Sequence, residues 1–310
     1  MNFKIIILII FSVWNNWNKT IILYYLKIMN DVNIMNDSTK IPANVVQLSD
    51  PVQAPKHEIK RSYSRIYGKN EILDGDYKLY QKILAEFIGT ALFVFGVCST
   101  CVYFADNPVI TVLSCSFMGG VIIFLFGRVS GAHFNPAISL ALFIRQKLTA
   151  LELALYIVGQ IVGSLLGCTL LGLIRKGKFK EMAGNQIADY LIYTDGGTKK
   201  NAWCYISALI NEIIGTFILI MFILASCERD NYLGPTLGLA FASVLISLNV
   251  IGGNISSCSL NPARSLGPAL VQVMAGGDKN PIKQIWIYLV GPFLGGILAA
   301  LIWPIFIFGQ

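Results

Sequence analysis

The sequence predicts an all-α membrane protein with six transmembrane helices and two re-entrant half-helices arranged as an inverted repeat. First, 55% of the 310 residues are apolar, only 13% are charged, and the mean hydropathy is +0.63, whereas soluble domains carry about 25% charged residues. Second, six apolar stretches are long enough to cross a hydrocarbon core about 30 Å thick. Third, two shorter apolar segments each contain the triplet Asn-Pro-Ala.

The six predicted spans cover residues 83–104, 109–127, 151–174, 203–226, 233–251 and 285–308. Two apolar segments between them, 132–144 and 260–272, are too short to cross and are predicted to be the re-entrant half-helices. The membrane domain is therefore expected at 83–308, with repeat one at 83–174, a loop at 175–202 and repeat two at 203–308.

Residues 1–82 form a predicted N-terminal extension. Its first part, 1–28, is apolar but interrupted by NNWNK; it is a membrane anchor, a dispensable extension or an upstream mis-start. Residues 29–82 are polar, so we expect them to be disordered and cytosolic. Seven bases at 56–82 and an even number of spans predict that both termini lie in the cytosol. The loop at 175–202, which would then lie outside, carries six bases and only three acids, so the charge rule supports this orientation only weakly.

Several other classes of function are disfavoured. The net charge of +7 comes from bases scattered over loops and termini, so no nucleic-acid partner is expected. Seven cysteines, mostly within apolar runs, do not form a disulfide framework. Cys98 and Cys101 form an isolated CxxC, and we expect neither a zinc nor a redox role there, nor any other metal or cofactor. No GxSxG, phosphate loop or HExxH motif indicates an enzyme.

The two halves of the membrane domain repeat each other. The segment AEFIGT begins at Ala85 and NEIIGT begins at Asn211. Glu86 precedes Asn135 by 49 residues, and Glu212 precedes Asn261 by the same 49. Each copy holds three spans, an odd number, so the second copy must be inserted upside down. Inverted repeats bring their broken helices together at the membrane midplane.

The repeated triplets consist of Asn135, Pro136 and Ala137 and of Asn261, Pro262 and Ala263. Asparagine is a strong N-cap and proline is favoured at the first helical position. Each asparagine oxygen is expected to cap its own half-helix, which leaves the side-chain NH2 free to donate into a pore. Two helix N-termini at one point create a positive field that disfavours protons and cations.

AEFIGT, SGAHFNPA, NEIIGT and NPARS, in this order, resemble the major intrinsic protein (aquaporin) family over residues 80–308. The resemblance implies a passive water channel that excludes protons and ions, in a lipid bilayer of the plasma membrane or an intracellular vesicle, assembled as a homotetramer. Passage of glycerol, urea or similar small neutral solutes is left open. The alternatives are a small-solute facilitator, an ion-coupled transporter, or a gated or structural membrane-junction protein of low permeability.

The resemblance also implies a selectivity filter that contains Arg264. The other filter positions, counted without gaps, are Cys115, Asn249 and Cys258. Water-selective members usually carry an aromatic residue and a histidine at the first two positions, so this filter is predicted to be wider but still polar. Cys258 matches the position at which mercurials block some members.

The remaining candidates have support or regulatory roles. Glu86 and Glu212 are interpreted as acceptors for loop backbone N–H groups, a structural role that the family supports over a proton relay. His133 is predicted to be a packed loop residue. Ser62 and Ser64, in the basic segment KRSYSR, are possible phosphorylation sites.

Overall fold

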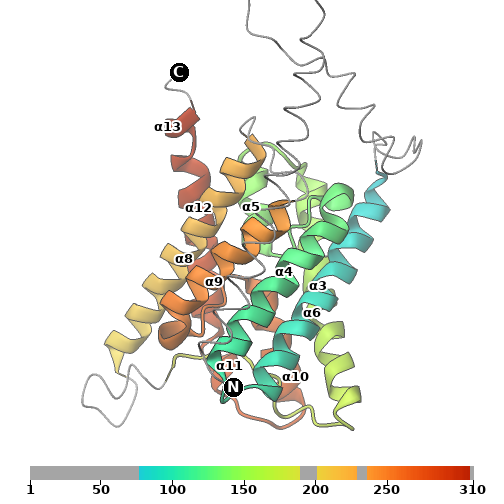
Figure 1. The fold of residues 1–310 in the computed structure, drawn as a ribbon, viewed down its shortest axis with the longest axis vertical. Helices are drawn as coiled ribbons and strands as arrows, with labels where there is room; N and C mark the ends of the chain where they lie inside the picture. Colours follow the sequence, from blue (N-terminus) through green and yellow to red (C-terminus); the bar gives the residue numbers. More distant parts are fainter. Residues whose placement is uncertain (1–76, 189–200, 229–235, 308–310) are drawn as a thin grey trace, which may run out of the picture. The chain divides into compact units, whose positions relative to one another are not determined.

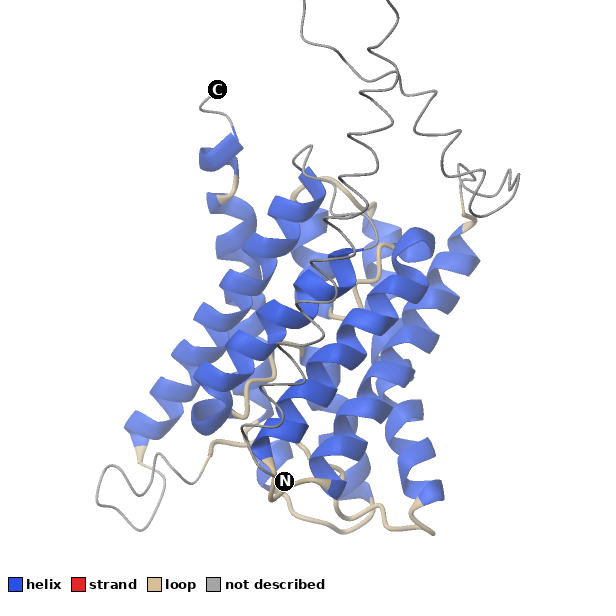
Figure 2. Ribbon diagram, viewed as in Figure 1, coloured by secondary structure: helices blue, strands red, loops and turns tan. Residues whose placement is uncertain are grey.

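The computed structural model describes residues 77–188, 201–228 and 236–307, and these residues contain helices and no strand (Figure 2). The long helices are α3 (Leu79–Tyr103), α4 (Pro108–Ser130), α6 (Ala150–Ile174), α8 (Ala202–Glu228), α9 (Leu237–Ser256) and α12 (Ile285–Ile302). The shorter ones are α5 (Pro136–Ile144), α10 (Pro262–Met274), α11 (Asn280–Lys283) and α13 (Pro304–Ile307).

The predicted six spans are confirmed, because six described helices are long and apolar enough to cross a membrane. Apolar side chains such as Phe124, Val158 and Leu298 are exposed along them, as expected for an integral multi-pass membrane protein in contact with lipid. Some boundaries differ from the prediction. Helix α3 starts at Leu79, within the predicted extension, and α9 covers Leu237–Ser256 instead of 233–251. Residues 1–76, with Ser62 and Ser64, lie outside the described part.

The same helix pairing occurs in both repeats. Helix α3 packs against α6, and α8 packs against α12. A Cβ atom at Gly163 of α6 would collide with the carbonyl oxygen of Phe87 in α3, and one at Gly295 of α12 would collide with the carbonyl of Ile213 in α8. The glycines therefore allow the helix backbones to touch, as small residues do in membrane helix pairs.

The two short helices α5 and α10 each pack against a long helix of the other repeat, α5 against α12 and α10 against α6. In Figure 1, α5 lies toward the end of the bundle where the described chain begins, and α10 lies toward the opposite end. Ser164 of α6 donates a hydrogen bond to the carbonyl of Ala263 (2.6 Å). At the symmetric contact, a Cβ atom at Gly296 of α12 would lie 3.0 Å from the carbonyl of Ala137. Neither repeat is complete without the other.

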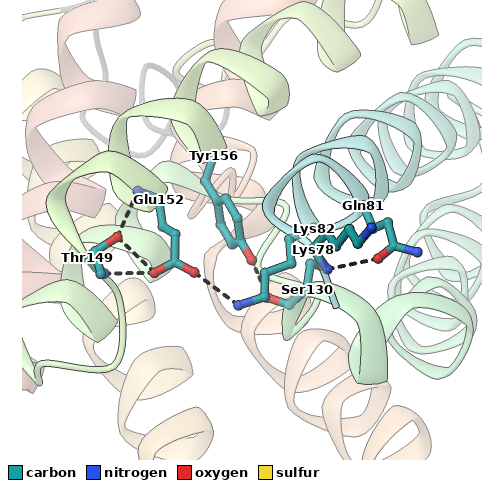
Figure 3. Close-up of polar contacts among 7 residues, drawn as sticks. All are labelled: Lys78, Gln81, Lys82, Ser130, Thr149, Glu152 and Tyr156. Atoms are coloured by element: carbon teal, nitrogen blue, oxygen red, sulfur yellow. Dashed lines mark hydrogen bonds and ion pairs between the residues drawn. The ribbon is translucent and has the colours of Figure 1, made fainter. Parts of the chain in front are cut away.

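Polar contacts fix the helices at the end that carries α5 (Figure 3). The ammonium group of Lys82 in α3 lies 3.0 Å from the carboxylate of Glu152 in α6. Glu152 also forms a capping box with Thr149 at the start of α6. Tyr156 donates its hydroxyl to the carbonyl of Ser130, the last residue of α4 (2.9 Å). These contacts anchor the point at which the chain leaves α4 and turns back into the bundle.

Substituting Gly163→Ala is expected to lower the thermal stability of the purified protein, because the new methyl group meets backbone atoms that cannot rotate away. Overpacking of this kind costs about 1–3 kcal/mol. Gly253→Ala is the matched control, since nothing lies within 4 Å of a Cβ atom there. Thermal unfolding followed by size-exclusion chromatography measures both. Equal stability of the two variants would contradict the close-packing interpretation.

Candidate functional site

Two loops enter the bundle between long and short helices, and both turn through left-handed backbone conformations. In the first loop Gly131, Ala132 and Phe134 have φ values of 88°, 53° and 48°. In the second, Ser257, Cys258 and Leu260 have φ values of 59°, 42° and 55°. Residues without glycine's freedom adopt this region only where the surroundings hold them. This turn explains why α5 begins at Pro136 and not at residue 132 as predicted.

A buried carboxylate holds the first loop. Glu86 has no exposed surface. One of its oxygens accepts hydrogen bonds from the Ser130 hydroxyl (2.6 Å) and the His133 amide (2.9 Å). The other accepts from the Phe134 amide (2.7 Å) and the Gln160 side chain (2.8 Å). Four donors thus replace the water that the carboxylate loses on burial.

Glu212 holds the second loop in the same way, also without exposed surface. Its oxygens accept from the Ser256 hydroxyl (2.6 Å), the Ser259 amide (2.9 Å) and the Leu260 amide (2.7 Å). Ser130 and Ser256 each lie five residues before the triplet asparagine, so the repeat offset identifies them, although the sequence analysis missed both. Gln160 has no such counterpart, because the matching segment YLVGPFLG has a proline in its place.

Each triplet asparagine caps its half-helix. The side-chain oxygen of Asn135 accepts from the Ala137 amide (2.9 Å). The oxygen of Asn261 accepts from the amides of Ala263 (3.0 Å) and Arg264 (3.2 Å). Both caps have extended backbones followed by proline at the first helical position. These contacts leave the two helix N-termini directed toward the same point.

The expectation that the asparagine NH2 groups remain free was wrong. Asn135 donates to the carbonyl of Leu260 (2.8 Å), and Asn261 donates to the carbonyl of Phe134 (2.8 Å). Leu260 and Phe134, which carry these carbonyls, have left-handed backbones. Their carbonyl oxygens therefore take no part in regular helical hydrogen bonds and need another donor. An amide NH2 carries two donors, so each asparagine keeps one N–H that no described residue accepts.

A small cavity lies where the two asparagines meet. Its volume is about 40 Å³, above the roughly 10–15 Å³ that a cavity needs to hold a water. Polar groups line it at Asn135, Asn261, His133 and Ser259, and the rest of the wall is largely apolar, including Phe93, Ile138 and Leu245. The cavity can hold water at a polar point of an otherwise largely apolar wall.

Arg264 is 7% exposed and follows the second triplet directly. Its guanidinium donates to the carbonyl of Ala183 (3.2 Å). The loop that supplies Ala183 is fixed in turn: Asn185 accepts from Ser265 (2.9 Å). Ala183 and Asn185 fall within the loop predicted at 175–202, but no motif there indicates a role at the site.

The other predicted filter residues fall into two groups. The sulfur of Cys115 lies 3.8 Å from the carbonyl oxygen of Val97 in α3. Cys258 contacts the carbonyl of Leu248 (3.2 Å), which places it beside the helical turn that carries Asn249. The Asn249 amide donates one N–H to its own helix at Leu245 (2.8 Å), and no described residue pairs with its oxygen or its second N–H. No hydrogen bond in the described part of the chain joins the two groups.

His133 is buried, with one ring nitrogen 3.0 Å from the Ser139 hydroxyl and its ring edge-to-face with Tyr156 at 5.2 Å. In the second repeat the corresponding contact joins Ser259 and Ser265. No cluster of three or more metal-ligating side chains occurs among the described residues.

Comparison with known proteins agrees with this geometry. Residues 75–303 match the model of the family described as Major intrinsic protein. Nodulin-26 of Glycine max is 32% identical over 231 residues, which cover 73% of this chain and 77% of that protein. Putative aquaporin NIP4-1 of Arabidopsis thaliana is 35% identical over 225 residues, covering 71% and 72%.

The solved structure of the aquaglyceroporin from Plasmodium falciparum superposes with a TM-score of 0.63 at 20% identity, covering 73% of this chain and 96% of that one. This similarity confirms the predicted fold. The family match covers most of the membrane helices, both capped half-helices and Arg264. The chain belongs to the major intrinsic protein family, the channel family that includes the aquaporins.

Proposed function

We propose that this protein is a passive water channel that excludes protons and ions. The observation that carries the proposal is the small cavity between Asn135 and Asn261, where two capped helix N-termini meet. A water there accepts a hydrogen bond from the free N–H of each asparagine, so its own hydrogens point away from the centre. The positive ends of both half-helices oppose a cation at the same point.

A second candidate, facilitated passage of glycerol, urea or similar small neutral solutes, is favoured by the filter positions. Cys115 and Cys258 are small, and Asn249 offers a carbonyl oxygen that a hydroxyl or amide can use. Arg264 supplies donors on the other side. A filter without an aromatic side chain leaves more room than water needs.

We further infer a homotetramer in the plasma membrane or an intracellular vesicle membrane, with both termini cytosolic and a structural role for Glu86, Glu212 and His133. The hydrogen bonds to the two carboxylates support that role, because all of them except the one from Gln160 come from a loop or from the serine just before it. No cofactor is needed for passive conduction.

Stopped-flow light scattering on proteoliposomes tests the main proposal. We expect osmotic shrinkage much faster than in protein-free vesicles and no increase in proton leak measured with an internal pH dye. Glycerol and urea uptake in the same vesicles decides between the two candidates. Uptake of either solute establishes the wide filter, and water flux alone limits the channel to water. No flux of any kind would contradict both candidates and favour a gated or structural protein.

A mercurial is expected to block water flux in the wild-type protein and to fail in Cys258→Ser. Serine keeps the hydrogen bond to the Leu248 carbonyl but has no sulfur for mercury to bind. The matched control is Cys204→Ser, since Cys204 is buried in a separate cluster with Ile187 and Tyr288. Full block in Cys258→Ser would refute this prediction and point to Cys115.

Glu212→Gln is expected to destabilise the second loop and reduce water flux. The NH2 group of the glutamine would face N–H groups whose hydrogen bonds the carboxylate accepts in the wild-type protein. Each buried group left unpaired costs about 1–3 kcal/mol. Glu181→Gln is the control, since that side chain is 77% exposed. Thermal stability and water flux are measured together. A normal stability with altered proton flux would instead indicate a proton relay.

A further inference from the structure

We propose that Asn185 is a positioning residue of the channel, which fixes the start of α10 in repeat two as Gln160 fixes the start of α5 in repeat one. Asn185 belongs to the connecting loop, residues 175–188 of the described chain, and through this loop it also sets the place of Arg264. The expected effect on solute passage rests on the proposed channel function, whereas the effect on the second loop does not.

Each half-helix carries a serine four residues after its triplet asparagine. These residues, Ser139 and Ser265, are both buried. The Ser139 hydroxyl lies 3.0 Å from a ring nitrogen of His133 in the first loop, and the Ser265 hydroxyl contacts that of Ser259 in the second. Each serine therefore ties the start of its half-helix to the loop that precedes it.

Each serine also has an amide side chain as a partner, but the two amides come from different elements. Gln160 of α6 donates to the Ser139 hydroxyl (2.9 Å). A proline stands at the matching position of α12 and offers no hydrogen-bonding side chain. Ser265 donates instead to the side-chain oxygen of Asn185 (2.9 Å). In repeat two the connecting loop thus supplies the contact that a membrane helix supplies in repeat one.

Asn185 joins three segments of the chain at a buried point. Its oxygen accepts from Ser265 in α10, and its NH2 group donates to the carbonyl of Ser257 in the second loop (3.3 Å). The Ser257 hydroxyl donates back to the carbonyl of Gln186 in the connecting loop (2.7 Å). Loss of the Asn185 side chain therefore frees the connecting loop, the second loop and α10 from one another at this point.

The same stretch of the connecting loop holds Arg264. The guanidinium donates to the carbonyl of Ala183, two residues before Asn185. Ala183 has a left-handed backbone (φ 51°), a conformation that persists in such a residue only where its surroundings hold it. Without Asn185 the Ala183 carbonyl is held less firmly, so the guanidinium gains freedom to move. A solute larger than water then passes Arg264 more easily.

Hydrogen exchange of the purified full-length protein, followed by mass spectrometry, tests the effect on the second loop. The amides of residues 257–260 are all hydrogen-bonded, as are the matching amides of residues 131–134 in the first loop. In Asn185→Ala we expect exchange at 257–260 to rise by about fivefold or more, as for the loss of one buried hydrogen bond. Exchange at 131–134 is expected to stay unchanged, because Gln160 holds that repeat.

Gln186→Ala is the matched control. Its side chain makes no hydrogen bond to any described residue, and the variant keeps the carbonyl that accepts from Ser257. Ser265→Ala removes the bond to Asn185 from the other side, so it serves where Asn185→Ala does not yield a folded protein. We expect faster exchange at 257–260 in Ser265→Ala and wild-type exchange in Gln186→Ala.

The ratio of glycerol to water permeability in proteoliposomes tests the effect on solutes. We expect this ratio to rise severalfold in Asn185→Ala and to stay at the wild-type value in Gln186→Ala. In a Ser265→Ala background, Asn185→Ala is expected to change the ratio much less, because the bond that the two residues share is already absent. A role in stability alone would lower thermal stability and leave the ratio unchanged.

Unchanged exchange at 257–260, an equal rise in both loops, or an unchanged permeability ratio in Asn185→Ala would overturn the proposal. An equal response in Gln186→Ala would overturn it as well. Faster exchange confined to the second loop, in a protein that conducts neither water nor glycerol, would refute the channel function and support the positioning role of Asn185.

Discussion

The rest of the structure depends on two reciprocal hydrogen bonds, from Asn135 to the Leu260 carbonyl and from Asn261 to the Phe134 carbonyl. They join residues 125 and 127 positions apart in the chain. Each asparagine also caps its own half-helix, so one side chain connects a helix start in one repeat to a loop in the other. Because all these groups are buried, breaking either bond leaves unpaired polar atoms in an apolar interior. Neither half of the pore centre forms alone.

The two repeats have the same scaffold but differ at the position that follows the triplet. Both loops are held by a buried glutamate, and both short helices pack on the opposite repeat. Arg264 follows the second triplet, however, whereas Ile138 occupies the same position after the first. The symmetric parts build the centre at which we propose that cations are opposed from either side. The single arginine makes the two sides of the pore chemically unequal.

Much of this arrangement follows from the sequence, because hydropathy, helix capping and repeat spacing are local or periodic signals. The six spans, the two half-helices and their asparagine caps are all of this kind. Contacts between helices are different. Several helices are apolar on every side, so no periodic pattern gives the rotation that brings Thr100 of α3 to Ser114 of α4. The partner of each asparagine NH2 was also beyond prediction, since it depends on left-handed residues at Phe134 and Leu260.

Two properties of a channel, exclusion of protons and discrimination between solutes, are expected at different places in this structure. Exclusion of protons is expected at the centre, where it rests on the two caps and the helix ends. Discrimination between solutes is expected at the guanidinium of Arg264, which donates to the carbonyl of Ala183. The loop that carries Ala183 is linked to the centre through Ser265 and Ser259, since Ser259 donates to the carbonyl of Asn261. We therefore expect a change in this loop to act first on which solutes pass, and to reach the centre that we propose opposes protons through these two serines.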